Sequence, residues 1–465
     1  MSTAVGEAGA TDSAKALLSR GYRAWLVVVL VVLSALNFAD RAVLSVLAQP
    51  IKEDLKLTDS ELGILQGLAF AILYSVLGLP IGWLAERVSR KNLIAACVAV
   101  WSVMTAACGM AGGFVSLLLG RVGVGVGEAG FQPVAWSLVA DHFRANRRAS
   151  ITAIILLGSP IGFLIGQSVG GIVAATWSWR VAFYALGIPG LLAALIAWMT
   201  LREPPRGLAE GAKTEAPPSV RAVVGTLWAK PAFRHLLAGF TLSGFAMNAV
   251  AQFVLPFYLR GFAVPLATLG VVFGTVAFTS NGLGMLLGGF GFDRLSRRDL
   301  RWSMWGPAIM LVVAAPLYLG AFSADTPMGS LALIWFANFS LATYMAPSLA
   351  TAQNLVGPRM RAMTSAIVAM VIGLLGAGLG PTLLGVASDR YASAFFTGGD
   401  FIASCPGGMA PPGSVAALDL ACREASASGL RAALISALVF FLWASVHYLL
   451  AARTLKRDLY RPAAS

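Results

Sequence analysis

Charged residues are scarce in this sequence. Only 12% of its 465 residues are Asp, Glu, Lys or Arg, whereas 58% are hydrophobic. The apolar residues occur in runs of about 20, the length that a helix needs to cross the hydrocarbon core of a bilayer. This composition excludes an ordinary water-soluble protein and predicts an integral membrane protein.

Histidine and cysteine are also rare, with three and four residues. His142, His235 and His447 are scattered, and the sequence has no H-E-x-x-H motif, no clustered Cys/His ligands and no P-loop. We therefore expect no enzymatic activity, no metal site and no other cofactor. Cys405 and Cys422 fall in one predicted loop, and the sequence leaves open whether they form a disulfide.

Twelve apolar segments are each long enough for a membrane helix, which predicts an all-α fold with twelve transmembrane spans. They lie at 24–48, 62–83, 92–113, 114–140, 150–175, 180–201, 233–258, 267–291, 302–322, 329–355, 363–389 and 430–452. The polar segment 1–22 lacks the features of a signal peptide, so we expect the first span to be retained.

The formal net charge of +13 does not indicate a nucleic-acid partner. If the N-terminus is inside, 25 of the 34 Lys and Arg residues fall in the two tails and in the loops of the same side. Positive residues favour the cytoplasmic side of a membrane. We therefore expect a multi-pass protein of the cell (inner) membrane with both termini in the cytoplasm.

The polar, Pro-rich segment 202–230 divides the spans six and six, as a linker between two bundles would. The halves repeat a pattern at an offset of 207, because GWLAERVSRKNL at 82–93 aligns with GFGFDRLSRRDL at 289–300. The expected organisation is a cytoplasmic tail (1–22), a six-helix bundle (23–201), a cytoplasmic linker (202–230), a second six-helix bundle (231–452) with a long outer loop (390–429), and a cytoplasmic tail (453–465).

The loop motif G-x-L-A-[DE]-R-x-x-R-K, the internal repeat and the twelve spans together resemble the major facilitator superfamily. This resemblance implies two pseudo-symmetric six-helix bundles and transport by alternating access. It also implies a cytoplasmic gate in which the loop pairs with an acidic residue at the inner end of helix 4. The expected gate residues are Gly82, Glu86, Arg87, Arg90, Lys91, Asp141, Asp293 and Arg294. The alternative is that the basic residues only anchor the loop on the cytoplasmic side.

Four charged residues lie deep inside predicted spans, namely Asp40, Arg41, Arg121 and Glu128. Charge within a membrane costs several kcal/mol unless it is paired or faces water, so these residues are functional candidates. The repeat places the uncharged Met247 and Asn248 at the positions of Asp40 and Arg41, which argues against a purely structural role. The alternative is that Asp40–Arg41 and Arg121–Glu128 are static ion pairs.

The stretch GRVGVGVGEAG at 120–130 contains the spacing G-x-G-x-x-G. A dinucleotide loop needs this motif between a strand and a helix, whereas here it lies inside a predicted span, so we reject that interpretation. On a helical wheel Arg121, Glu128 and Gln132 share one face, and Gly120, Gly123, Gly127 and Gly130 gather on another. The polar face predicts a cavity wall, and the glycine face predicts close helix packing.

Glycines at four-residue spacing also occur in the second, fifth, eighth and eleventh spans, for example Gly63 with Gly67 and Gly158 with Gly162. In the superfamily these four helices form the seam between the two halves. The resemblance therefore implies that the glycines lie on the surfaces that move past one another.

N-F-A-D-R at 37–41, together with R-V-G-V-G-V-G-E-A at 121–129, resembles the spinster family within that superfamily. Its members are associated with transport of sphingosine-1-phosphate or lysophospholipids, and helices 1, 4, 7 and 10 line the central cavity in the superfamily. We therefore expect a proton-coupled secondary active transporter of an amphiphilic anionic lipid, with Asp40 and Glu128 as proton-binding residues. The expected cargo-binding residues are Arg41, Arg121, Asn37, Gln132, Phe245, Met247, Asn248, Trp335, Asn338 and Tyr344.

Two alternatives share the same sequence features. One is a proton-coupled exporter or symporter of drugs or small organic anions, and the other is a membrane sensor or binding protein that transports nothing. The expected partners are the cargo, protons and the lipid bilayer, and we expect the protein to act as a monomer.

Overall fold

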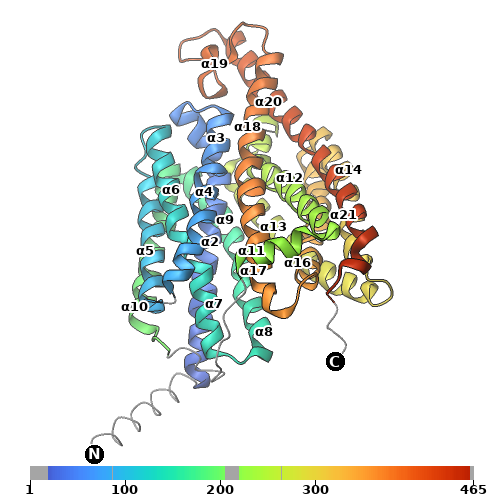
Figure 1. Cartoon of the computed structure of the whole chain (residues 1–465). Coiled ribbons are helices and arrows are strands. Elements are labelled where there is room, and N and C mark those ends of the chain that lie inside the picture. Colours follow the sequence, from blue (N-terminus) through green and yellow to red (C-terminus); the bar gives the residue numbers. More distant parts are fainter. Residues whose placement is uncertain (1–18, 86, 205–218, 263, 461–465) are drawn as a thin grey trace, which may run out of the picture. The chain divides into compact units, whose positions relative to one another are not determined.

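The computed structural model describes residues 19–85, 87–204, 219–262 and 264–460. All regular structure in these ranges is helical, and twelve helical segments are long and apolar enough to cross a membrane (Figure 1). These segments confirm the predicted all-α fold with twelve spans. The first six spans are α2 (Arg20–Leu55), α3 with α4 (Asp59–Gln66, Leu68–Ala85), α5 (Arg90–Cys108), α6 with α7 (Phe114–Ala129, Phe131–His142), α8 with α9 (Ala145–Leu156, Gly158–Thr176) and α10 (Trp179–Thr200).

The short helix α11 (Val220–Trp228) precedes the remaining six spans. These are α12 (Pro231–Phe262), α13 (Leu266–Ser296), α14 (Trp302–Ser323), α15 with α16 (Pro327–Ala342, Met345–Asn354), α17, η2 and α18 (Arg361–Val371, Ile372–Gly378, Leu379–Phe395), and α20 with α21 (Ala416–Ala437, Val439–Asp458). Short helices also lie at η1 (Pro358–Met360), α19 (Phe401–Ser404) and η3 (Pro406–Gly408).

Several spans are interrupted where the sequence weakens the helix. α3 ends at Gly67, and α6 and α7 meet at Gly130, as expected because glycine destabilises a helix interior. η2 is a π-helix rich in glycine. At the other end of α3, Thr58 forms a capping box with Glu61, since Thr58 Oγ1 accepts from Glu61 N at 3.1 Å and Glu61 Oε2 accepts from Thr58 N at 2.8 Å.

The chain forms two compact units. Of the described residues, the first unit contains 19–44, 72–85 and 87–204, and the second contains 45–71, 219–262 and 264–460. The end of α2, α3 and the start of α4 therefore pack in the second unit, although they belong to the first half of the sequence. The predicted bundle boundaries at 23–201 and 231–452 stay predictions.

The glycine face of α6 packs against α5 in the first unit, as predicted. A Cβ atom added at Gly127 would approach Trp101 N to 2.5 Å, and one added at Gly123 would approach Met104 Cγ to 2.6 Å. Only glycine permits so close an approach of the two backbones.

The glycines of α9 were expected on a surface that moves past the other half, but Gly158 and Gly162 face another helix of the same unit. A Cβ atom at Gly158 would lie 2.6 Å from Ser34 Cβ, and one at Gly162 would lie 2.8 Å from Phe38 Cβ, so both glycines pack against α2 inside the first unit. This row holds the charged helix α2 in place within its own unit.

In the second unit, α12 packs against α21, α18 packs against α20, and α14 contacts both α15 and α21. α3 also packs against α18. Gly63 makes this contact possible, because a Cβ atom there would lie 2.9 Å from the Cα atom of Thr382.

Candidate functional site

Four charged side chains meet inside the first unit. Asp40 and Arg41 lie on α2, and Arg121 and Glu128 lie on α6. Arg41 Nε donates to Glu128 Oε2 at 2.7 Å, and Arg121 Nη1 lies 3.6 Å from Asp40 Oδ2. Both ion pairs thus join the two helices, which corrects the alternative that each pair forms within one span. We call these four residues the central cluster.

The central cluster is shielded from solvent except at Arg41. Asp40, Arg121 and Glu128 are 3%, 2% and 1% exposed, whereas the Arg41 side chain is 23% exposed. The Arg41 guanidinium also lies 4.5 Å from the centre of the Tyr74 ring, in a cation–π contact. Two arginines balance two carboxylates, which limits the electrostatic cost of burial. Arg41 is thus the most exposed member of the cluster.

The two carboxylates of the cluster accept few hydrogen bonds. Thr105 Oγ1 donates to Asp40 Oδ1 at 2.7 Å. Among the described residues, Asp40 Oδ2 and Glu128 Oε1 accept no hydrogen bond. Buried carboxylate oxygens normally have donors, because an unsatisfied charge is costly in a low-dielectric interior. These two oxygens are therefore chemically suited to bind a proton.

Asn37 and Gln132 lie on the same two spans as the cluster. Asn37, one turn before Arg41, is buried, and its Nδ2 donates to no acceptor in the described ranges. Gln132 lies on α7, beyond the break at Gly130, and is partly exposed. No hydrogen bond within the described structure joins either residue to the cluster, and their role in binding cargo stays a prediction.

The expected cargo residues on α12 and near α16 lie in the second unit and make separate contacts there. Tyr344 Oη donates to Met247 Sδ at 3.8 Å, and the Phe245 ring lies 4.6 Å from the Phe440 ring. Asn248 Nδ2 donates to a backbone carbonyl one turn earlier at 2.8 Å. The positions that correspond to Asp40 and Arg41 in the repeat thus make uncharged contacts.

The two expected cargo residues on α15 bind other helices of the second unit. Trp335 Nε1 donates to Thr279 Oγ1 of α13 at 3.0 Å, and Asn338 Oδ1 accepts from Tyr318 Oη of α14 at 2.7 Å. Their polar atoms therefore contribute to packing within the unit, and their role in binding cargo stays a prediction.

A second cluster in the first unit surrounds Arg90, which is 1% exposed. Arg90 Nε donates to Glu203 Oε1 at 2.8 Å, Nη2 donates to the Pro204 carbonyl at 2.8 Å, and Nη1 donates to Asp141 Oδ2. The backbone N–H of Lys91 donates to Glu203 Oε2 at 3.0 Å. The loop arginine is thus bound to the expected acidic residue of the fourth span, and Glu203 is a second partner that the motif did not indicate.

Glu203 lies outside the membrane-spanning helices. Partial burial acts to raise the pKa of its carboxyl group, but hydrogen bonds from Arg90, from the Lys91 N–H and from Ser89 Oγ outweigh burial and hold that pKa below its usual range. Glu203 is therefore ionised at neutral pH, and it ties the segment after α10 to the start of α5.

The other expected gate residues are less connected. Arg87 Nη1 donates to the Trp83 carbonyl at 3.3 Å, and Gly82 lies where α4 approaches α7. In the second unit, Asp293 and Arg294 are exposed and form no ion pair with another described residue. Glu86 lies outside the described residues. Arg297, which the repeat aligns with Arg90, is exposed, so the repeated motif builds no buried arginine cluster among the described residues.

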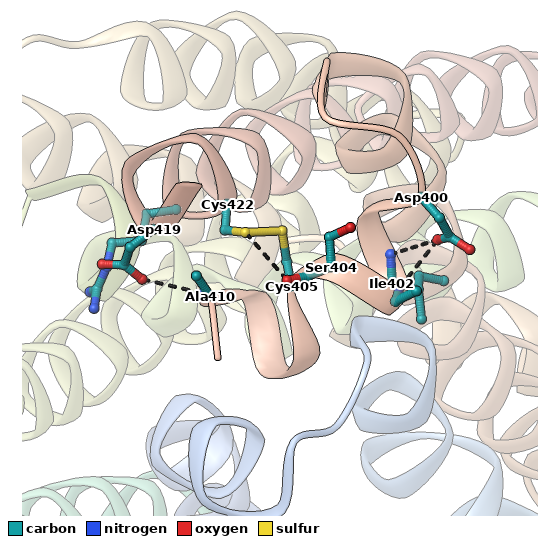
Figure 2. The surroundings of a disulfide bond; sticks show 9 residues. Asp400, Ile402, Ser404, Cys405, Ala410, Asp419 and Cys422 are labelled. Carbon is teal, nitrogen blue, oxygen red and sulfur yellow. Dashed lines mark hydrogen bonds and ion pairs between the residues drawn. A yellow bond between two sulfur atoms is a disulfide. The ribbon is translucent and has the colours of Figure 1, made fainter. Parts of the chain in front are cut away.

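Cys405 and Cys422 form a disulfide, the pairing that the sequence left open (Figure 2). The bond closes a loop of the second unit, and both cysteines are buried in a small hydrophobic core with Phe396 and Phe401. Asp400 caps α19 by accepting from Ile402 N at 3.0 Å. The loop is thus an ordered structure with its own core.

Sequence reasoning missed Thr105, Tyr74 and Glu203 as partners of the two clusters. Thr105 and Tyr74 are single polar residues in apolar spans, a weak signal that gives no partner. Glu203 had a better signal, because it is an acidic residue directly after the sixth span, on the side that is otherwise basic.

Comparison with known proteins shows the family of the chain. Residues 30–381 match the Major Facilitator Superfamily model. An MFS-type efflux pump of Mycolicibacterium smegmatis is 33% identical over 373 residues, which cover 79% of this chain and 85% of the pump. Protein spinster homolog 1 of Mus musculus is 30% identical over 404 residues, which cover 80% and 74% of the two chains.

A solved structure is also similar over nearly the whole chain. It is the crystal structure of a bacterial homolog to the human lysosomal transporter Spinster, in an inward-facing and unoccupied conformation. Its TM-score is 0.88 at 30% identity, and the match covers 96% of this chain and 100% of that chain.

The chain therefore belongs to the major facilitator superfamily, and it is a membrane transporter rather than an enzyme. Within that superfamily it is of the spinster type. Both assignments confirm the resemblances carried by the loop motif and by the motifs at 37–41 and 121–129.

Proposed function

We propose that this transporter couples protons to the movement of an amphiphilic anionic lipid, such as a lysophospholipid or a sphingosine-1-phosphate-like molecule. The observation that carries the proposal is the central cluster, in which Arg41 alone is partly exposed and two carboxylate oxygens lack donors among the described residues. Such buried charges are costly and are typical of ion and substrate pathways.

Arg41 is the proposed link between cargo and proton. Its guanidinium binds Glu128, so an anionic head group that binds Arg41 competes with that carboxylate. Glu128 without its partner would be an unpaired buried charge, which is costly unless the carboxylate takes up a proton. Anion binding and proton binding therefore favour each other by linkage. Asp40, paired with Arg121, offers a second proton site of the same kind.

The proposed contacts of the lipid tail lie in the second unit. α12 carries no Asp, Glu, Lys or Arg between His235 and Arg260, and α15 carries none at all. We propose that the tail contacts the apolar and aromatic side chains of this group, and that the amides orient the linker of the lipid. These residues are Phe245, Met247, Asn248, Trp335, Asn338 and Tyr344.

The test is flux of a labelled lysophospholipid or sphingosine-1-phosphate into proteoliposomes, with and without an imposed pH gradient. We expect flux that depends on the gradient in the wild type, and loss of this dependence in Asp40→Asn and Glu128→Gln. Arg423→Ala, which removes an exposed arginine, is the matched control for Arg41→Ala. Unchanged flux in Arg41→Ala would show that Arg41 does not bind the head group. Flux in the wild type that does not depend on the gradient would show that transport is not coupled to protons.

A second candidate is export of drugs or small organic anions. It is favoured by the similarity to a protein named as an MFS-type efflux pump, which covers 79% of this chain. Flux of such solutes with no flux of either lipid would select this candidate. Binding of lipid without any flux would instead favour a sensor that does not transport.

We also propose an inner-membrane location with both termini in the cytoplasm, from the distribution of Lys and Arg. We propose that the transporter acts as a monomer. Protease accessibility of the two tails in oriented vesicles tests the orientation, and the mass of the detergent-solubilised particle tests the monomer.

A further inference from the structure

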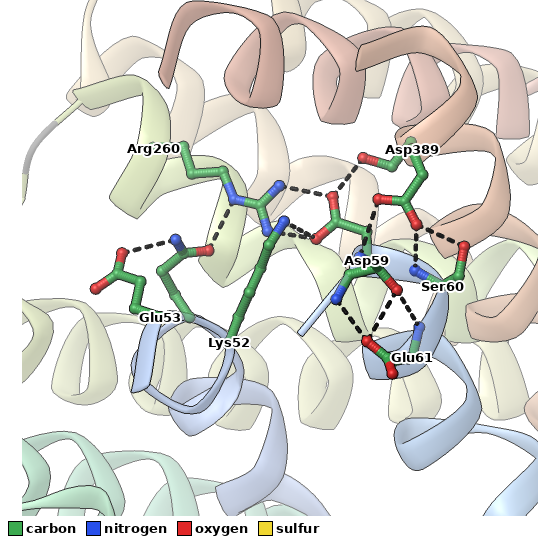
Figure 3. A network of polar contacts seen from close by, with 10 residues as sticks. Lys52, Glu53, Asp59, Ser60, Glu61, Arg260 and Asp389 are labelled. Carbon is green, nitrogen blue, oxygen red and sulfur yellow. Dashed lines mark hydrogen bonds and ion pairs between the residues drawn. The ribbon is translucent and has the colours of Figure 1, made fainter. Parts of the chain in front are cut away.

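The second unit contains a buried ion-pair network that joins the two halves of the sequence. Lys52 and Asp59 come from the first half, and Arg260 comes from α12 in the second half (Figure 3). All three lie among the residues of the second unit, because Ser45–Ala71 packs there. In the orientation proposed above, these residues lie at the outer ends of their spans.

Asp59 is the centre of this network. Its Oδ1 accepts from Lys52 Nζ at 2.7 Å and from Arg260 Nη2 at 2.6 Å. Its Oδ2 accepts from Arg260 Nη1 at 2.7 Å and from Ser388 Oγ at 2.6 Å. The arginine contact is bidentate, and the Lys52, Asp59 and Arg260 side chains are at most 5% exposed. Charge-assisted, bidentate bonds in a buried setting are among the strongest polar contacts in proteins.

Asp389 of α18 completes the network. Its carboxylate accepts from Asp59 N at 3.0 Å, from Ser60 N at 2.7 Å and from Ser60 Oγ at 2.5 Å, so it caps the start of α3. Arg260 Nε donates to Gln49 Oε1 of α2 at 2.7 Å. Both α12 and α18 are thereby bound to residues 49–60 of the first half. We call Lys52, Asp59, Arg260, Ser388 and Asp389 the outer network.

The disulfide-bonded loop covers the outer network. At Gly407 the backbone has φ of 73°, and an added Cβ atom would lie 3.1 Å from the carbonyl oxygen of Lys52. At Gly408, with φ of 84°, an added Cβ atom would lie 3.5 Å from Lys52 Nζ. Positive φ and such close contact both favour glycine at these positions. The Cys405–Cys422 bond directly precedes this turn and fixes it to α20.

We propose that Asp59 and its partners form the outer gate of the transporter, and that the disulfide-bonded loop holds this gate closed. In alternating access the two halves of the sequence must separate on one side and then on the other. Residues 49–60 cannot leave α12 and α18 unless the bonds to Asp59 break. The proposal rests on transport, which family membership establishes, and not on the proposed cargo or proton.

The test measures opening without any cargo. Spin labels are placed at two exposed residues on the same predicted side, Met110 in the first unit and Thr268 in the second, with Cys97 and Cys108 replaced by alanine. Distances are measured by double electron–electron resonance in lipid nanodiscs. We expect Asp59→Asn to raise the population of longer distances at least threefold over the wild type. Asp325→Asn, at an exposed aspartate of another loop on that side, is the matched control and leaves the distribution unchanged.

Two milder variants keep the proposal testable if Asp59→Asn does not fold. Ser388→Ala removes one hydrogen bond to Asp59 and is expected to shift the distribution in the same direction by a smaller factor. The double variant Cys405→Ser/Cys422→Ser releases the loop and is expected to raise the longer population about twofold. Unchanged distances in Asp59→Asn or Ser388→Ala would overturn the gate, and unchanged distances in the cysteine variant would overturn the role of the loop.

Discussion

The central cluster and the outer network contain similar charges but satisfy them differently. In the central cluster, Asp40 Oδ2 and Glu128 Oε1 accept no hydrogen bond from the described residues, and Arg41 is partly exposed. In the outer network, each oxygen of Asp59 accepts two hydrogen bonds, and Asp389 accepts three.

This difference separates two uses of a buried ion pair. A fully bonded carboxylate is held in one state, because breaking any partner leaves an uncompensated buried charge. In the proposed mechanism, a carboxylate with an oxygen that accepts no hydrogen bond can instead bind a proton when its arginine partner binds an anion. This contrast fits the two proposals, in which the outer network holds the outer gate closed and the central cluster exchanges a proton for an arginine contact.

The largest expected effect compares the stability of matched substitutions. Asp59→Asn leaves Lys52 and Arg260 buried with reduced compensation and should destabilise the protein by about 3–5 kcal/mol. Asp40→Asn also removes a charged partner of the buried Arg121, but that contact is longer, at 3.6 Å, and Asn keeps an acceptor for Thr105, so a smaller loss of about 1–3 kcal/mol is expected. Thermal unfolding in detergent measures both, and equal losses would contradict the comparison.

A substitution that prevents proton binding in the central cluster should reduce transport. Glu128→Gln cannot take up a proton, and it frees Arg41 from a charged partner. We expect pH-driven flux of the labelled lipid to fall ~100-fold, or about 2.7 kcal/mol. Glu424→Gln, at an exposed glutamate of the second unit, is the control and should keep wild-type flux. Full flux in Glu128→Gln would move the proton site to Asp40 alone.

Substitutions in the Arg90 cluster should lower the unfolding free energy, as those in the outer network do. Arg90→Lys keeps the charge but loses the planar fork that binds Glu203, Asp141 and the Pro204 carbonyl together. We expect a loss of about 1.5–3 kcal/mol in unfolding free energy. Arg87→Lys, at an exposed side chain that bonds the Trp83 carbonyl and stacks on the Trp83 ring, should change it by less than about 1 kcal/mol. Similar losses at both positions would show that Arg90 has no special role.

Acid should weaken the Arg90 cluster through Glu203. Because its folded-state pKa lies below the usual range, ionised Glu203 stabilises the fold above the unfolded pKa of about 4.3, and this contribution disappears as pH falls through the lower folded pKa. Unfolding temperatures from pH 7 to pH 3 should therefore fall less steeply in Glu203→Gln than in the wild type. Parallel curves would mean that the folded protein does not lower the pKa of Glu203.

The smallest effect is expected at an exposed pair. Asp419 binds Arg423 on the surface of α20 at 2.7 Å, with side chains 39% and 59% exposed. Asp419→Asn should cost less than about 1 kcal/mol, because solvent screens such pairs. Thermal unfolding at low and high salt measures this loss, and a cost as large as that of Asp59→Asn would show that burial does not explain the outer network.

Much of the fold could be predicted because its signals are local in sequence. Twelve apolar runs gave the twelve spans, and charges within such runs pointed to the central cluster. The glycine face of α6 followed from helical periodicity, and it does pack against α5.

The partners could not be predicted, since they depend on how helices face one another. Arg41 binds Glu128 rather than the adjacent Asp40, because α2 and α6 cross with those side chains toward each other. The outer network was also missed, since Asp59 and Arg260 lie 201 residues apart near the ends of predicted spans, where charges are common. The disulfide depended on a loop fold that composition does not specify.

In the proposed mechanism an anion on Arg41 and a proton on Glu128 bind together. The most direct measurement is proton uptake by the purified transporter when sphingosine-1-phosphate or a lysophospholipid is added in weakly buffered solution with a pH indicator. We expect net proton uptake by the wild type and much less by Glu128→Gln and Arg41→Ala. Binding of the lipid to the wild type without any change in bound protons would contradict it.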